Sequence, residues 1–137
     1  MTNPGKDPRR EVLDLLQNLY KEYMAGRLGL HKDHLTNDVV LLGPGDPRVL
    51  KGKDNYLNYL RTLSQKAWLR KFKTQAEDVK VFSETVVVSE IYTSQLRIKG
   101  KDYQETGRTT TVMIRRDGKW YVTHMHMESL ARNRIVV

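Results

Sequence analysis

The Asp117-Gly118 pair constrains this chain more than any other feature, because it stands between two long runs of branched and aromatic residues. Both central residues of a type I′ turn need positive φ, and Asp-Gly is one of the pairs that adopt it. The pair therefore predicts a two-residue hairpin between strands 102–116 and 120–129. Counting back from the turn places these pairs on one side of the sheet: Arg115 with Trp120, Met113 with Val122, Thr111 with His124, and Thr109 with His126.

The other side of this hairpin is predicted to be rich in apolar residues. It carries Val112, Ile114, Tyr121 and Met125. A long sheet with apolar residues on both faces has more apolar area than one layer of helices covers. We therefore expect a homodimer or a higher homo-oligomer.

The first half of the chain has helical periodicity. Asp7-Pro8 is a helix start, and an apolar stripe follows it as far as Gly26. A shorter helical segment is expected over 28–35, a buried strand over 38–42, and a third helix after Gly52. Strands are expected over 68–82 and 85–98. This order predicts an α+β fold with helices on one face of an antiparallel sheet.

Length and composition limit the number of domains, the kinds of site and the location that we expect for this protein. The 137 residues suit a single domain over 1–137, with 1–6 expected to be a flexible tail. The absence of cysteine excludes disulfides, thiolate nucleophiles and zinc–thiolate sites. The sequence has no apolar signal segment and no run of about 20 apolar residues, so we expect a cytoplasmic protein with no membrane partner.

The formal net charge of +8 raises the question of nucleic-acid binding. The basic residues are dispersed along the chain, and the densest cluster, over 66–73, has only Trp68 and Phe72 beside it as stacking platforms. We expect a solvated basic surface and no specific nucleic-acid partner.

The closing segment resembles a known family. Arg115-Arg116-Asp117-Gly118-Lys119-Trp120, followed by His124-Met125-His126-Met127-Glu128-Ser129, is similar to the final hairpin of the SnoaL-like branch of the nuclear transport factor 2-like superfamily. The closest similarity is to the association, or hub, domain of calcium/calmodulin-dependent protein kinase II and its stand-alone relatives. The resemblance implies a cystatin-like cone, with N-terminal helices packed on a strongly curved antiparallel sheet.

The resemblance also implies a small-molecule pocket inside the cone. Hub domains bind anions there through arginines, whereas this chain has Thr111 and Thr93 near those positions and Tyr56 in place of a pocket histidine. We expect a small hydrophobic or anionic ligand and no cofactor. The predicted ligand-binding residues are Tyr56, Thr93, Thr109, Thr111, His124 and His126. Strand 85–98 presents either Glu90 and Tyr92 or Ile91 and Thr93 to the pocket, because a bulge near Gly100 would exchange its faces. The resemblance places the side of the hairpin with Thr111 and His124 inside the cone and its apolar side outside.

Two functions remain open at this stage. One is a binding and assembly domain; the other is a cofactor-free isomerase, polyketide cyclase or dehydratase with His124, Glu90 or Glu105 as general base. A metal site is not expected, because His124 and His126 have only Glu128 nearby as a third ligand. His31 and His34 lie in a short polar segment and are expected at the surface.

Overall fold

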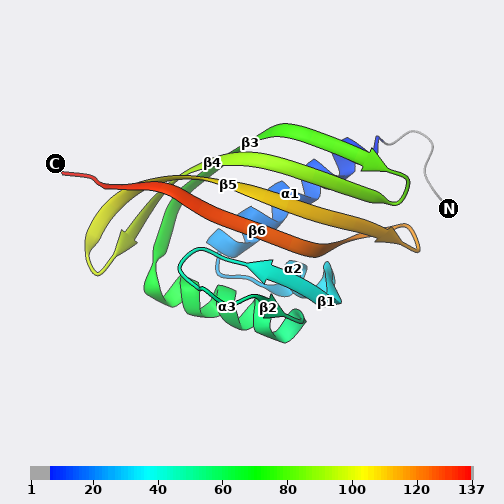
Figure 1. Ribbon diagram of the computed structural model, residues 1–137. Helices are drawn as coiled ribbons and strands as arrows, with labels where there is room; N and C mark the ends of the chain where they lie inside the picture. Colours follow the sequence, from blue (N-terminus) through cyan, green and yellow to red (C-terminus); the bar gives the residue numbers. More distant parts are fainter. Residues whose placement is uncertain (1–6, 137) are drawn as a thin grey trace.

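The computed structural model describes residues 7–136, and the six N-terminal residues expected to form a tail lie outside them. Helices α1–α3 lie on one side of a strongly curved sheet (Figure 1). The elements in chain order are α1 (Pro8–Met24), α2 (Gly29–Asp33), β1 (Leu35–Leu42), β2 (Leu50–Lys51), α3 (Lys53–Lys66), β3 (Trp68–Phe82), β4 (Thr85–Ile98), β5 (Lys101–Arg116) and β6 (Lys119–Arg134).

The sheet has the order β2-β1-β6-β5-β4-β3. Its neighbours are antiparallel except β1 and β6, which run parallel. The predicted α+β fold, with N-terminal helices on a curved antiparallel sheet, is therefore confirmed.

Helix α1 begins as its sequence predicts. The side chain of Asp7 accepts a hydrogen bond from the backbone N–H of Arg9 at 3.0 Å, and Pro8 occupies the first turn. Val12, Leu16 and Leu19 recur on one face and are buried against the sheet. Helix α1 thus closes one side of the cone.

The hairpin turns set the orientation of the central strands. Asp117 and Gly118 both have positive φ, as predicted, and so do Lys99 and Gly100 between β4 and β5. The β4–β5 ladder runs without a bulge from Ile98 to Thr85. Its alternation buries Glu90 and Tyr92 inside the cone and leaves Thr93 exposed outside. The prediction that Thr93 faces the pocket is therefore wrong.

A bulge in β6 changes the expected register of the last hairpin. Met113 pairs with Val122 as predicted, but Val112 pairs with His124 and Thr111 with Met125, so Thr123 is the extra residue. Val122 donates its backbone N–H to the His34 carbonyl, and Thr36 donates its hydroxyl to that of Thr123 at 3.3 Å. The bulge therefore lies where β1 joins β6.

The bulge exchanges the faces of every residue that follows it up to Ser129. His124 and His126 lie on the outer face, and Met125 and Met127 lie inside. The predicted pairs of Thr111 with His124 and Thr109 with His126 are wrong for this reason. The expected place of Met125 in the outer apolar face is wrong as well.

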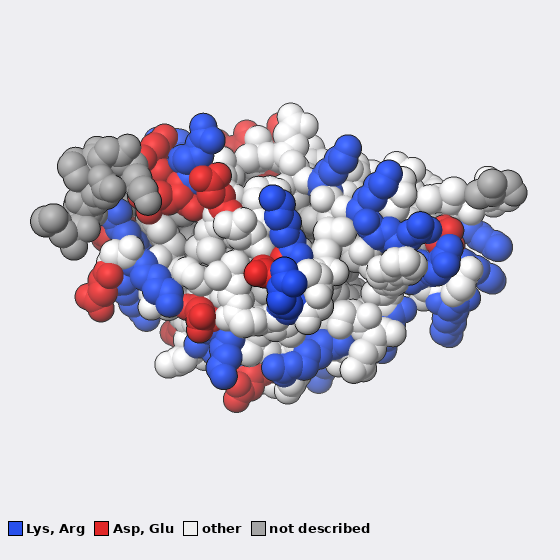
Figure 2. Space-filling view, turned by 180° about the vertical axis from the view of Figure 1, so that it is seen from behind, with Lys and Arg blue, Asp and Glu red and all other residues white. Residues whose placement is uncertain are grey.

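The charged surface agrees with the dispersed pattern of the sequence. Figure 2 shows the face that carries α1, with Lys and Arg spread over much of it and Asp and Glu beside them. Within residues 7–136, no helix has the length and apolar character needed to cross a membrane.

Candidate functional site

An apolar cavity of about 100 Å³ lies between the helices and the inner face of the sheet. The residues that line it come from all three helices, the loop after β1, and strands β1, β3 and β6. They are Leu16, Leu19, Tyr20, Tyr23, His31, Leu35, Leu41, Gly43, Pro44, Tyr56, Tyr59, Leu60, Leu69, Phe72, Val122, Met125 and Met127. None of these described lining residues is Lys, Arg, Asp or Glu.

Tyr20 links the cavity to a buried carboxylate on the sheet. Its hydroxyl donates to Glu90 Oε1 at 2.6 Å, and the Thr109 hydroxyl donates to the same oxygen at 3.4 Å. Burial, and then the neighbouring Glu90 charge, raise the pKa of Tyr20 well above its ordinary value. Tyr20 is therefore a neutral donor. Its hydroxyl connects the cavity, which Tyr20 lines, to the Glu90 carboxylate behind it.

Tyr56 and Tyr23 contribute two more neutral aromatic groups. Tyr56 is buried and lines the cavity from α3, the place that the sequence predicts for it. Burial raises its pKa, and burial raises the pKa of Tyr23 to about 12. Both side chains therefore present apolar rings and uncharged hydroxyls.

His31 lines the cavity, although the sequence predicts it at the surface. It lies on α2 and is only 6% exposed, and its Nδ1 has no hydrogen-bond partner among the described residues. Burial lowers its pKa to about 4, against an opposing effect of the Glu22 charge. Its imidazole is therefore neutral at pH 7. The spacing of Leu28 and His31, three residues apart, is a signal of a shared helix face.

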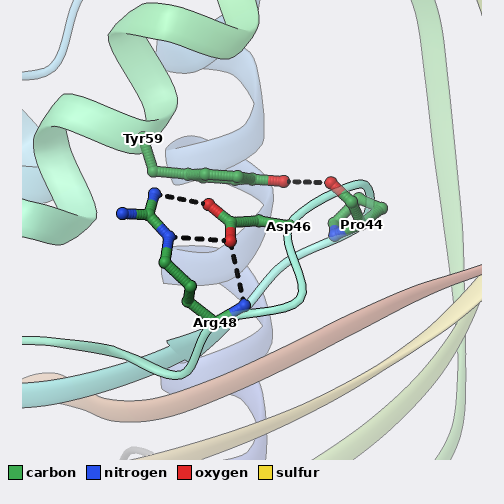
Figure 3. Close-up of polar contacts among 4 residues, drawn as sticks. All are labelled: Pro44, Asp46, Arg48 and Tyr59. Carbon is green, nitrogen blue, oxygen red and sulfur yellow. Dashed lines mark hydrogen bonds and ion pairs between the residues drawn. The ribbon is translucent and has the colours of Figure 1, made fainter.

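The loop after β1 lies beside α3 (Figure 3) and contributes Gly43 and Pro44 to the cavity wall. The Tyr59 hydroxyl donates to the Pro44 carbonyl at 2.6 Å, and a side chain at Gly43 would overlap the Tyr59 ring. Asp46 accepts from the Arg48 backbone N–H at 2.9 Å and from its guanidinium at 2.8 and 3.0 Å. These bonds hold the pKa of Asp46 at about 2 and fix the loop.

A polar cleft of about 500 Å³ lies beside this loop and shares Pro44 and Tyr59 with the cavity. Glu105 lines it and accepts from Arg132 Nε at 2.7 Å and from the Tyr92 hydroxyl at 3.0 Å. A second bulge, at Leu130, aligns Arg132 with Glu105. Glu105 and Arg132 thus line the same cleft as Asp46 and Arg48, whereas Glu90 lies apart from it, bonded to Tyr20.

The residues predicted to bind a ligand do not form one cluster. Tyr56 lines the cavity; Thr109 and Thr111 are buried on the inner face but bond to Glu90 and to the sulfur of Met125. His124 and His126 lie on the outer face with Thr93. Of the predicted catalytic candidates, only Glu90 and Glu105 lie inside the cone.

Metal ligands are not gathered in the part of the chain that the structure describes. His126 Nε2 lies 3.7 Å from Glu128 Oε2 on the outer face. No group of three His, Asp or Glu side chains suited to a metal ion is found within residues 7–136.

The sequence matches a known family over most of its length. A family model for the SnoaL-like domain covers residues 12–131. The chain belongs to this SnoaL-like family. No curated protein matches the sequence.

Solved structures share the fold of this SnoaL-like domain at low sequence identity. A nuclear transport factor 2-like protein from Cytophaga hutchinsonii has a TM-score of 0.77 and 19% identity, over 91% of this chain and 100% of that one. A ketosteroid isomerase-like protein from Erwinia carotovora atroseptica has a TM-score of 0.77 and 13% identity, over 86% of this chain and 92% of that one. A candidate calcium/calmodulin-dependent protein kinase II association domain from Xanthomonas campestris has a TM-score of 0.73 and 23% identity, over 95% of this chain and 93% of that one.

Proposed function

We propose that this SnoaL-like domain binds one small, neutral, mainly apolar molecule in the cavity between its helices and its sheet. The observation that carries the proposal is the character of the lining, in which no charged side chain occurs among the described residues. Its titratable groups are tyrosines with raised pKa values and His31 with a lowered one, all uncharged at pH 7.

The electrostatics favour a neutral ligand over an anionic one. Moving a carboxylate out of water into an apolar site costs several kcal/mol unless a cation or several donors meet it. Arg48 and Arg132 line the polar cleft at its solvent-exposed side and already pair with Asp46 and Glu105. Of the two ligand classes that the sequence left open, the hydrophobic one fits this cavity.

The size of the cavity favours a ligand with about one ring. A cavity of about 100 Å³ is of the order that accepts a single benzene-sized molecule. Each buried CH₂ group of such a ligand contributes about 0.8 kcal/mol to binding. Toluene and benzoate are therefore suitable probes, since they are similar in size but toluene is neutral and benzoate is an anion.

Calorimetry with these two probes tests the proposal. We expect toluene to bind and benzoate not to bind at the same concentration. Leu60→Trp, which enlarges a lining residue, should remove toluene binding, whereas Leu63→Trp on the same helix, beside the polar cleft, should leave it intact. Equal binding of benzoate, or the absence of toluene binding to the unmodified protein, would contradict the proposal.

A second function is favoured by the contact between Tyr20 and Glu90. A carboxylate that is 3% exposed and hydrogen-bonded to a cavity hydroxyl is suited to remove a proton from a ligand, the task of an isomerase, cyclase or dehydratase base. Its test is deuterium exchange next to the carbonyl of cyclohexenone. Glu90→Gln should abolish the exchange and Glu105→Gln should retain it; exchange that survives Glu90→Gln would exclude this base.

Assembly into a homodimer is a further part of the proposal. The outer face carries Val112, Ile114 and Tyr121, all half-buried, and Ile91, which is 48% exposed. Apolar groups in this arrangement favour self-association. Light scattering should give a dimer mass that Val112→Arg lowers and that Asn18→Arg, at an exposed position of α1 on the opposite side of the sheet, does not. A monomer mass at high concentration would exclude the dimer.

A further inference from the structure

The His31 imidazole is a polar group without a partner in an otherwise apolar wall. It is buried, it lines the cavity, and its Nδ1 makes no hydrogen bond with any described residue. A buried polar atom that lacks a partner destabilises the folded protein, and most such atoms in native proteins are paired. A buried polar atom without a protein partner, in a residue that lines a ligand cavity, is suited to receive its partner from the ligand.

Two of the four tyrosine hydroxyls in the wall are already occupied as donors. Tyr20 donates to Glu90 and Tyr59 donates to the Pro44 carbonyl. His34, three residues after His31, also has a partner, because its Nδ1 lies 2.7 Å from the Trp120 carbonyl. Among the described ring nitrogens that are buried, the Nδ1 of His31 is therefore the one left for a ligand.

The chemistry of a neutral imidazole identifies the ligand group. Nδ1 either carries the ring proton and seeks an acceptor, or carries a lone pair and seeks a donor. A hydroxyl group is both a donor and an acceptor, so it pairs with either tautomer without a charge. A methyl group pairs with neither, and a carboxylate brings a charge that the wall does not offset.

We infer that His31 recognises the single polar group of the ligand, and that the ligand is a small alcohol or phenol with its hydroxyl on Nδ1 and its hydrocarbon part among the leucines and tyrosines of the cavity. This inference rests on the proposed function of the cavity. Tyr23 and Tyr56 line the same cavity, and their uncharged hydroxyls are further partners for the ligand oxygen.

Phenol and toluene form the matched pair that tests the inference, because they differ by a hydroxyl in place of a methyl group. Their affinities are measured by calorimetry for the unmodified protein, for His31→Leu, and for His126→Leu as the control on the outer face. The ratio of phenol to toluene affinity should fall about five- to tenfold in His31→Leu, as expected for one hydrogen bond, and should not change in His126→Leu.

The outcomes separate the inference from the proposed function. If toluene binds but the affinity ratio is the same in the unmodified protein and in His31→Leu, the recognition role of His31 is wrong and the apolar cavity site stands. If neither probe binds the unmodified protein, both are wrong.

A spectroscopic measurement on the unmodified protein covers the case in which His31→Leu does not fold. In protein labelled with ¹⁵N-histidine, phenol should shift the His31 Nδ1 resonance, because a hydrogen bond forms at that atom. Toluene should shift it much less. An Nδ1 resonance that responds equally to both probes, or to neither while toluene binds, would overturn the inference.

Discussion

The two compartments inside the cone differ sharply in charge, although they share the walls formed by Pro44 and Tyr59. The cavity beside α1 and α2 is apolar, and its one imidazole is neutral and unpaired at Nδ1. The cleft beyond Tyr59 holds ion pairs, Asp46 with Arg48 and Glu105 with Arg132. One fold thus forms an apolar compartment and, next to it, a second compartment lined by ion pairs.

This difference shows where charge is tolerated in so small a domain. Glu105 is buried, but Arg132 is half-exposed and provides a charged partner that water also reaches. His31 has no such partner and remains neutral instead. Burial therefore keeps the cavity imidazole neutral, whereas hydrogen bonds from Arg48 hold the pKa of Asp46 at about 2.

The largest expected effect is a pH dependence of stability that originates in the cavity. The pKa of His31 is lowered from 6.5 to about 4, so the unfolded chain binds a proton in this range that the folded protein does not. The stabilisation is fully present above pH 6.5 and is lost as pH falls towards 4, by at most about 3 kcal/mol. Urea unfolding at pH 7, 5.5 and 4.5 measures it.

His31→Leu is the control for this pH dependence. The variant should lose the decline between pH 6.5 and 4.5 that the unmodified protein shows, since the titrating group is gone. An equal decline in both proteins would mean that His31 is not buried in its neutral form.

The next effect concerns the ion pair of the cleft. Glu105→Leu should destabilise the protein by about 2 kcal/mol, because the Tyr92 hydroxyl and the Arg132 guanidinium lose their acceptor. Glu105→Gln should cost less, because its carbonyl oxygen still accepts from Tyr92. Thermal unfolding of the two variants compares these costs, and equal melting temperatures would show that the acceptor at this position is not needed.

A smaller effect is expected at the wall between the compartments. Tyr59→Phe removes the hydrogen bond to the Pro44 carbonyl and should cost about 1 kcal/mol of stability. The loop beside the cavity is then held less firmly, so toluene should enter and leave faster with little change in affinity. Stopped-flow binding measures both rates, and unchanged rates would indicate that ligands do not pass this wall.

Local signals in the sequence were sufficient for most of the fold. The Asp117-Gly118 turn and the Asp7-Pro8 helix start depend on neighbouring residues, and the structure has both as expected. Strand β4 has its predicted bounds, but the sequence did not establish which of its faces is buried. The second helix is shorter than expected, Gly29–Asp33, because the chain enters β1 already at Leu35. The last strand extends past Ser129 to Arg134.

The site was harder to predict, because one extra residue in β6 exchanges the residues on the inner and outer faces of this strand. The bulge at Thr123 forms where β1 pairs in parallel with β6, a contact between distant parts of the chain. A signal was nevertheless present, since the apolar residues Trp120, Val122, Met125 and Met127 are spaced by two, three and two. This spacing favours a bulge over strict alternation, which would place two methionines outside and two histidines inside.

The burial of His31 is also a result of tertiary contacts. Lys32 and Asp33 are exposed beside it, as a polar segment predicts. The imidazole is buried because α1 and α3 both pack against α2, and a five-residue helix has too few positions to show which face is covered. Sequence periodicity could therefore suggest this residue but could not establish its role.

The central claim, that a small neutral molecule occupies the apolar cavity, is tested most directly by the methyl resonances of the methionines. Met125 and Met127 line the cavity, and Met24 lies on α1 outside it with 36% exposure. In protein labelled with ¹³C at the methionine methyl groups, toluene should shift the Met125 and Met127 signals through its ring current and leave the Met24 signal in place. Shifts confined to Met24, or no shift at saturating toluene, would contradict the account.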